Sequence, residues 1–427
     1  MKLKWYWKVL IALAVLITIG LFSADVIVDR LAEKQLRKIQ EQFAGQYDFS
    51  YDKLNVSIIA KDVVLKNFKF FTIVDSLVYK DKFDFELDEL YIHLDDYFGL
   101  ITEGKLNIKK IEIINPKVIY GLKFIKESAN QASEEFDDTT TVNGESDELF
   151  LKYLNIDELV LENGKADVFR LIKPDDKLLF VEDLDINITG ISIDFTSDSL
   201  LATTGFETFV YNASEIYSTG LKDHELSIDN FHYDYTGEGF TISKFHIKNK
   251  KSKVDFNLER TYRTPWISVD VSEIAFNINP WELFKDEVID VNRISLTKAD
   301  ITLFVDLNLP LNPKIKPMPS KMIRSVPVSF DLDTLLLNEA SFVFMNKMKG
   351  EKPGYLKLAP INGYMSNITN ISELLEIDPI TKLDIETKIW DEGIVDIQIL
   401  IDVPNLNDPM HVDGIVTDLS FIKVENM

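Results

Sequence analysis

The sequence predicts a mainly β protein: a long, twisted and curled antiparallel sheet that follows an N-terminal transmembrane helix and a short amphipathic helix. Three observations support this prediction. The chain begins with lysines and an apolar stretch, apolar and polar residues then alternate in many short runs, and one short pattern recurs among these runs. Alternation with a period of two gives a strand one apolar and one polar face. We therefore expect a repetitive sheet that forms an apolar groove.

The N-terminal residues are typical of a signal anchor. Residues 1–8 carry three lysines and form the expected cytoplasmic tail, and residues 9–28 form the expected transmembrane span. Cations before an apolar run keep that end in the cytoplasm, and about 20 residues are enough to cross a bilayer. A cleaved signal peptide is the alternative, but Phe22 stands where cleavage favours a small residue. The predicted anchor residues are Val9, Leu10, Ile11, Leu13, Val15, Leu16, Ile17, Ile19, Leu21 and Phe22.

An amphipathic stalk helix is predicted over residues 29–45. Leu31, Leu36, Ile39 and Phe43 recur at helical spacing with charged residues between them, and Gly45 ends the pattern. We expect the apolar stripe of this helix to cap the first strands.

From Tyr47 onward the apolar residues follow a period of two, in about twenty short runs. The alternation at Val254, Phe256 and Leu258 is one of these runs and predicts a strand. The glycines Gly237 and Gly239 predict a hairpin turn between two others. The residues that we expect to line the groove are Phe83, Phe85, Leu87, Ile186, Ile188, Ile191 and Ile193.

The recurrent pattern consists of alternating apolar residues, one polar residue, a small residue or proline, and renewed alternation. A turn or bulge at the small residue would join or bend successive strands. Repeats of this kind predict a sheet that grows by addition of similar units. The segments are 111–120, 159–168, 294–303 and 335–344, with Pro116, Gly164, Ala299 and Ala340 at the equivalent position.

Two segments interrupt the strands. Residues 126–149 are rich in Ser, Glu, Asp and Thr and predict a flexible acidic loop, and Leu309–Pro327 predicts an extended crossing. The loop divides an N-terminal β segment, residues 46–125, from a longer β-repeat groove, residues 150–427.

Composition excludes several functions. The chain has 46 basic and 70 acidic residues, a net charge of −24, so nucleic acid is not an expected partner. It has no cysteine, which excludes disulfides and thiolate chemistry. The five histidines lack metal-ligand spacing, and no phosphate-binding loop or nucleophile motif occurs. We therefore expect neither catalysis nor a metal or cofactor.

The order of these segments carries a family resemblance. The anchor is followed by 49–70 and then by Leu90–Tyr120, in which strand, turn and strand lead into alternating apolar residues and Asn115-Pro116. In these features the chain resembles the AsmA-like family of bacterial envelope proteins, relatives of the TamB translocation and assembly module. The resemblance implies a curled sheet with an apolar inner face, tethered by a single pass in the bacterial inner membrane, with most of the chain in the periplasm. It further implies phospholipid as the bound molecule, a role in outer-membrane homeostasis, and no catalytic residues.

The sequence leaves three uses of the apolar face open. An open groove would accept acyl chains, because each buried CH₂ contributes about 0.8 kcal/mol. A β-sandwich would instead bury two such faces against each other. A scaffold would pair its free sheet edge with strands of outer-membrane protein clients.

Overall fold

We describe the fold from a computed structural model of the chain. It describes residues 47–57, 60–73, 82–96, 99, 103–122, 152–170, 173–196, 204–235, 239–278, 288–313, 316–349 and 354–419. The predicted tail, transmembrane helix and stalk helix lie outside these ranges, as does the predicted acidic loop 126–149. Within the described ranges, no helix has the length and apolar character needed to span a membrane.

The described residues are mainly β, as the alternation predicts. Strands hold 72% of them, and all 18 strands belong to one mixed sheet. The described strands therefore do not form two separate facing sheets. By contacts the chain divides into two compact units, Met1–Tyr211 and Asn212–Met427, and the boundary falls inside strand β9 (Thr208–Ser218).

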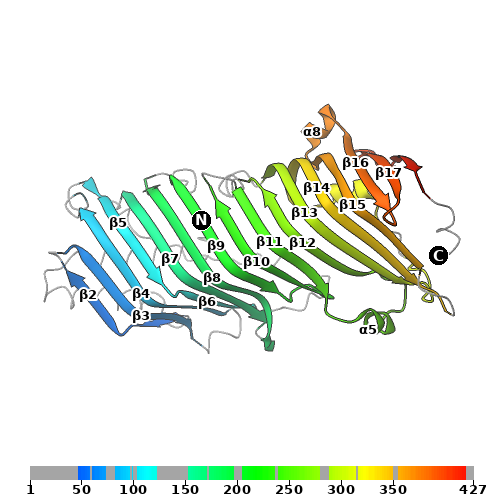
Figure 1. Cartoon of the computed structure of the whole chain (residues 1–427). Coiled ribbons are helices and arrows are strands. Elements are labelled where there is room, and N and C mark those ends of the chain that lie inside the picture. The colour runs from blue at the N-terminus through cyan, green and yellow to red at the C-terminus, as the bar shows by residue number, and fades with distance from the viewer. Residues whose placement is uncertain are drawn as a thin grey trace, which may run out of the picture. The chain divides into compact units, whose positions relative to one another are not determined.

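Unit 1 is a row of strands in which hydrogen-bonded neighbours are close in sequence (Figure 1). β3 pairs with β1, β2 and β4, and β4 pairs in turn with both β5 and β6. β7 follows β5 and β6, and β8 follows β7. The strands are β1 (Tyr47–Ser50), β2 (Lys53–Ser57), β3 (Asp62–Thr72), β4 (Lys82–Asp96), β5 (Lys105–Ile114), β6 (Lys117–Leu122), β7 (Tyr153–Arg170) and β8 (Lys173–Asp194).

Unit 2 continues in the same manner, with each strand from β10 to β18 paired to the next (Figure 1). Three described helices interrupt the strands. The elements are β10 (His224–Asp234), β11 (Gly239–Asn249), α5 (Lys253–Leu258), β12 (Trp266–Phe276), β13 (Val288–Asp306), α7 (Pro319–Arg324), β14 (Ser329–Lys347), β15 (Gly354–Thr369), α8 (Ser372–Ile377), β16 (Ile380–Ile389), β17 (Gly393–Asp402) and β18 (Met410–Thr417). The predicted hairpin at Gly239 is confirmed, because β10 pairs with β11 from Asp234 and Gly239 outward.

The prediction of a purely antiparallel sheet is wrong at two places. β7 runs parallel to β5 and β6, and β14 runs parallel to β13. Parallel neighbours need a crossover, and the predicted crossing Leu309–Pro327 lies between β13 and β14. It is not wholly extended, because α7 lies within it. Alternation along one strand carries no information on the direction of its neighbour, so the sequence pattern missed both parallel pairs.

The predicted strand at Val254, Phe256 and Leu258 is also wrong, because these residues lie in helix α5. The Ser252 hydroxyl accepts a hydrogen bond from the Asp255 backbone N–H at 3.2 Å and caps the helix. Phe256 is buried, whereas Val254 and Leu258 are 63% and 78% exposed. Three apolar positions are too few to separate a strand from one helical turn with a single buried residue.

The recurrent pattern corresponds to a bulge in the strands. Its polar residue has a left-handed backbone in all four segments, with φ of 52° at Asn115, 55° at Asn163, 52° at Lys298 and 53° at Glu339. The small residue or proline that follows is buried each time. A bulge adds one residue to a strand, so the apolar residues before and after it stay on the same face although their spacing changes parity.

The repeated segments also pair with one another. In the parallel pairs Ile114 lies opposite Glu162 and Lys117 opposite Lys165, which aligns the two bulges of unit 1. The Asn115 N–H donates to the Glu162 carbonyl and the Lys165 N–H to the Pro116 carbonyl, at 2.9 and 2.8 Å. β13 and β14 align the bulges of unit 2 in the same way. Each unit thus contains one parallel pair of repeats, which confirms a sheet built from similar additions.

Candidate functional site: the apolar sheet face

Unit 1 closes much of its apolar face. Ile111 is 0% exposed, and Ile92, Leu106 and Ile108 are each 1% exposed. These residues come from β4 and β5 and belong to a cluster that also draws on β3, β7 and β8. Ring contacts extend the cluster, with the Phe68 and Phe85 centroids 6.4 Å apart. Side chains of the sheet fill this part of the face, so it offers little room for a bound molecule. The buried members are Val63, Leu65, Phe68, Leu87, Leu90, Ile92, Leu94, Leu106, Ile108, Ile111, Ile113, Leu154 and Ile156.

Unit 2 leaves its apolar face more open. The central cluster there has few buried members, and two of them are the small bulge residues Ala299 and Ala340. The large apolar side chains around them remain partly exposed, although they lie on β11 to β16 and have strand neighbours on both sides. These partly exposed residues are Phe245, Val269, Ile274, Leu296, Leu337, Phe342, Leu358 and Ile385.

A second cluster of unit 2 lies where β15 and β17 end. Ile323 of α7 and Leu375 of α8 are buried there against Ile368, Ile401 and Val403. Several large neighbours on β14, β15 and β17 are again only partly buried. The two short helices therefore cover one margin of the unit 2 face and leave the rest uncovered by any described helix.

The predicted groove residues divide between these environments. Phe83 and Leu87 are buried, at 9% and 3% exposure, and Phe85 is partly buried in the unit 1 cluster. Ile191 and Ile193 pack against the same cluster, which brings β4 and β8 residues together. Ile186 and Ile188 are partly exposed and lie opposite Leu161 and Leu159 of β7, outside the cluster of buried residues.

The open residues of unit 2 were not predicted as lining. The signal that could have found them is the recurrent pattern, because 294–303 and 335–344 contain Leu296, Leu337 and Phe342. Alternation identifies a face, but it does not rank the exposure of its members, which depends on how neighbouring strands pack.

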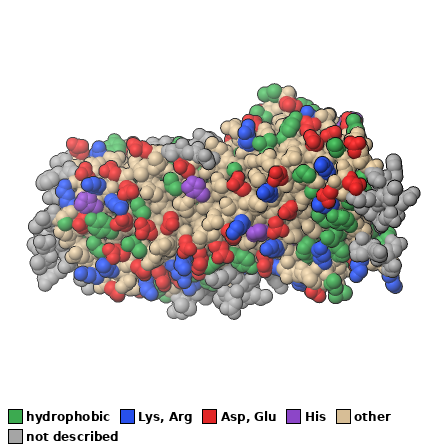
Figure 2. Space-filling view, viewed as in Figure 1, with side chains coloured by type: hydrophobic (Ala, Val, Ile, Leu, Met, Phe, Trp, Pro, Cys, Tyr) green, Lys and Arg blue, Asp and Glu red, His purple; other side chains and the backbone are tan. Residues whose placement is uncertain are grey.

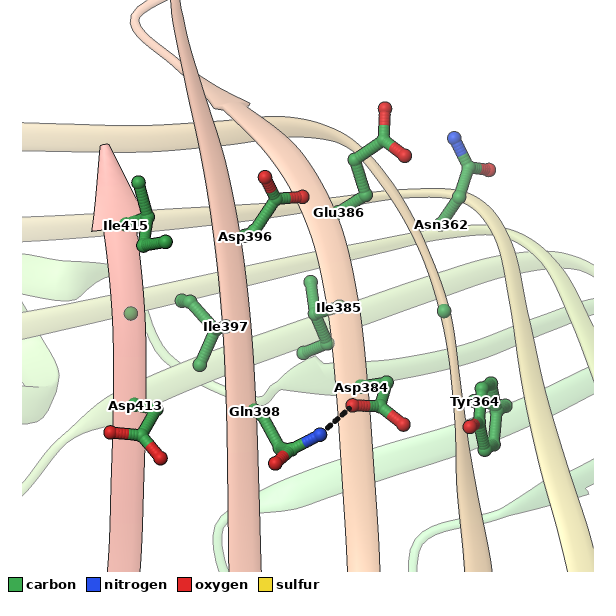
Figure 3. Close-up of a pocket in the computed structure, with 12 residues that line it drawn as sticks. Asn362, Tyr364, Asp384, Ile385, Glu386, Asp396, Ile397, Gln398, Asp413 and Ile415 are labelled. Carbon is green, nitrogen blue, oxygen red and sulfur yellow. Dashed lines mark hydrogen bonds between the residues drawn. The ribbon is translucent and has the colours of Figure 1, made fainter. Parts of the chain in front are cut away.

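A hollow of about 590 Å³ lies over β15 to β18 of unit 2 (Figure 3). Three rows of residues, in register across the four strands, line it. The middle row has glycine at both ends and isoleucine between, and the flanking rows are mostly polar. The rows are Asn362, Glu386, Asp396 and Ile415; Gly363, Ile385, Ile397 and Gly414; and Tyr364, Asp384, Gln398 and Asp413.

Asp384 has the best-defined electrostatics in this hollow. The Gln398 side-chain N–H donates to it at 2.8 Å (Figure 3). The Lys382 ammonium lies 2.6 Å from its other oxygen. Hydrogen bonds from Lys382, Tyr364 and Gln398 lower the pKa of Asp384 to about 2. Asp384 is therefore ionised at neutral pH and suits neither a proton donor nor a general base.

Two histidines pair with carboxylates of neighbouring strands. The ring nitrogens of His93 and His246 lie 2.6 Å from the carboxylates of Asp62 and Asp270. Burial and the hydrogen bond to Asp62 raise the pKa of Tyr91 to about 12. In the part of the chain that the structure describes, no group of three or more potential ligands could hold a metal ion. Figure 2 shows acidic and basic side chains spread over the visible face of the strands.

Comparisons of this chain with protein-family models, with curated proteins and with solved structures gave no match. The resemblance to the AsmA-like family therefore stays a prediction from the sequence motifs.

Proposed function

We propose that this chain is a membrane-anchored periplasmic protein whose apolar sheet face binds or transfers phospholipid and so supports outer-membrane homeostasis. The observation that carries the proposal is the open apolar face of unit 2. Large side chains such as Leu337 and Phe342 remain partly exposed at the middle of a sheet, where strand neighbours lie on both sides.

An acyl chain fits such a face for a physical reason. Contact with water is unfavourable for both surfaces, and each CH₂ removed from water contributes about 0.8 kcal/mol. A lipid tail in a bilayer is removed from water to a similar extent, so the free energy of moving it between the bilayer and the protein is close to zero. A sheet face of this kind would suit transfer without a specific polar pocket, and we propose no catalytic role for any residue.

Photo-crosslinking of the full chain in its own cells would test the proposal. A photoreactive amino acid at Leu337 faces the cluster of Ala299 and Ala340, whereas the same amino acid at Leu336 points to the opposite face of β14. We expect phospholipid adducts at Leu337 and not at Leu336, read by mass spectrometry. Lipid adducts at neither position, in a protein that folds normally, would contradict the proposal.

A scaffold function is the second candidate, and β18 favours it. All eight residues of β18 are exposed, and its described pairing is with β17 alone. Met410, Val412 and Val416 are 42%, 52% and 52% exposed. An edge strand without lysine or proline is suited to pair with a strand of a client protein. Crosslinks from β18 positions to outer-membrane proteins, without lipid adducts at Leu337, would favour this function over lipid binding.

A further inference from the structure

One margin of unit 2 presents large apolar side chains to solvent. Ile377, at the end of α8, is 82% exposed, Leu406, in the turn between β17 and β18, is 84% exposed, and Met322 of α7 is 56% exposed. Met318, Val326 and Val328, on either side of α7, are about 40% exposed, at 38%, 41% and 40%. We call these six residues the α7–α8 tip. Figure 2 shows hydrophobic side chains at the top of unit 2, where Figure 1 places α8.

The three segments of the tip rest on a common buried support. Ile323, Leu375 and Val403, one from each segment, belong to the same cluster. Val403 is 0% exposed, and Ile323 directly follows the exposed Met322. The segments are therefore neighbours in space, and the exposed members stand on a packed base.

Hydrogen bonds fix the backbone of the tip. The Arg324 guanidinium donates to the carbonyls of Val403 and Asn405 and lies 2.6 Å from the Asp408 carboxylate. The Ser320 hydroxyl, on a residue that is 1% exposed, donates to Asp408 at 2.8 Å.

The loop that leads into β14 is held in the same way. The Asn370 side chain donates to the carbonyls of Val326 and Val328, at 3.2 and 2.9 Å. The tip is thus held in place while its apolar side chains face water. Exposed apolar groups on a fixed backbone mark an interaction surface more strongly than the same groups scattered singly.

The α7 segment of the tip is locally basic, although one of its cations, Arg324, is paired with Asp408. Residues 309–328 carry four basic residues and no acidic residue, in a chain with a net charge of −24. Lys316 and Lys321 are exposed next to Met318 and Met322. On α8, Glu373 and Glu376 are exposed and oppose this charge. The cations are therefore concentrated on the α7 side of the tip.

We propose that the α7–α8 tip inserts into the surface of a phospholipid bilayer. The apolar side chains project from three separate segments. A fluid bilayer can accommodate separate side chains, whereas a protein partner would need a complementary pocket for each. Lysines beside them suit the interface, because their stems can lie along apolar groups while the ammonium reaches lipid phosphates. This inference does not depend on the proposed lipid binding by the sheet face. Fluorophores at positions 377 and 406 report insertion of the tip, whereas the photoreactive amino acid at Leu337 reports lipid on the sheet face.

The absence of cysteine from the chain allows a direct test. Single variants Ile377→Cys, Leu406→Cys and Leu258→Cys of the full chain would each carry an environment-sensitive fluorophore. Leu258 is a matched control, because it is 78% exposed on α5, at the opposite margin of unit 2. The proteins would be placed on phosphatidylcholine–phosphatidylglycerol vesicles that contain nitroxide-labelled lipid.

We expect a blue shift and several-fold stronger quenching at positions 377 and 406 than at position 258. The predicted anchor would bring all three labels to the vesicle, so only local insertion separates them. Adding Ile377→Asp to the variant labelled at position 406 should reduce the quenching there. Equal, weak quenching at all three positions would overturn the proposal. The partner of the α7–α8 tip would then be an apolar surface of another protein. A blue shift at positions 377 and 406 that grows with protein concentration in the absence of vesicles would also overturn it. The tip would then be a contact between copies of the chain.

Discussion

At the scale of single residues, the sheet depends on positions where the backbone is left-handed. Asn163 has φ of 55°, and its N–H donates to the Asp185 side chain of the next strand at 2.9 Å. Glu339 has φ of 53°, and its N–H donates to the Asn362 side chain, also at 2.9 Å. The bulge amide, which the regular ladder would leave unpaired, is therefore satisfied by a side chain of the adjacent strand in both units.

Substitution of Asn163 should show the cost of this conformation. Asn163→Gly keeps the left-handed backbone available and should change the free energy of unfolding by less than about 0.5 kcal/mol. Asn163→Val should destabilise by about 1–2 kcal/mol, because a β-branched residue is strained at positive φ. Urea unfolding of both variants measures the difference. Equal stability of the two would show that the backbone there is not left-handed.

Two glycines of the hollow offer a matched pair. A Cβ at Gly363 would lie 2.2 Å from the Asp384 carbonyl oxygen, whereas a Cβ at Gly414 has its nearest atom at 3.7 Å. Gly363→Ala should therefore lower stability by about 1–3 kcal/mol, because the obstacle is backbone of the neighbouring strand. Gly414→Ala should be close to neutral. Thermal unfolding compares the two, and a neutral Gly363→Ala would contradict the close approach of β15 and β16.

Asp384 predicts a pH dependence at the acid end. Its pKa is lowered from 3.8 to about 2 in the folded chain, so its contribution to stability is complete above pH 3.8 and is lost as the pH falls through about 2. Asp384→Asn should flatten the stability curve in that window and leave the curve shape above it unchanged. Unfolding in urea at a series of pH values checks this. If the stability of Asp384→Asn fell with pH below 3.8 in the same way as that of the unmodified chain, the contacts of Asp384 with Lys382 and Gln398 would not form in solution.

At the scale of elements, sequence alternation predicted strands well and their partners less well. The apolar alternation of 111–120 and 159–168 falls on β5, β6 and β7, and these repeated segments pair side by side. Parallel pairing escaped prediction because strand direction depends on the crossover, and Leu309–Pro327 has no pattern that reveals α7. The unit boundary inside β9 has no signal in composition or in a linker.

Helix α5 forms where apolar alternation predicted a strand, and the N-cap residue Ser252 stabilises it. The contribution of this cap can be tested. The Ser252 hydroxyl also donates to the Asp255 carboxylate at 2.7 Å, in addition to accepting the Asp255 N–H. Ser252→Ala should cost about 1 kcal/mol of helix stability. Hydrogen exchange at the Phe256 amide, which donates to the Ser252 carbonyl at 2.9 Å, should speed up accordingly. Ser325→Ala, beyond the last residue of α7, is a control that should leave this amide unchanged.

At the scale of the whole molecule, the two units share the recurrent bulged segment but differ in how far they bury their apolar residues. Both contain a parallel pair of repeats with aligned bulges, yet the cluster of unit 1 has thirteen buried apolar residues, whereas the two clusters of unit 2 have five and four. The sequence predicted an apolar face and placed its lining on β4 and β8 of unit 1, where Phe83 and Leu87 are buried and the other five predicted residues are partly exposed. Exposure could not be predicted because it depends on neighbours that are distant in sequence.

This difference between the units predicts that the same kind of substitution destabilises unit 1 much more than unit 2. Ile111→Glu places a charge where the side chain is 0% exposed and should lower stability by at least about 3 kcal/mol. Leu337→Glu puts the carboxylate on a partly exposed face, where water can reach it, and should cost about 1 kcal/mol or less. If lipid occupies that face, Leu337→Glu should nevertheless abolish the lipid adducts formed by a photoreactive residue at Phe342. A folded Leu337→Glu protein that retains full crosslinking would show that acyl chains do not lie along unit 2, and severe unfolding of the same variant would show that its face is closed as in unit 1.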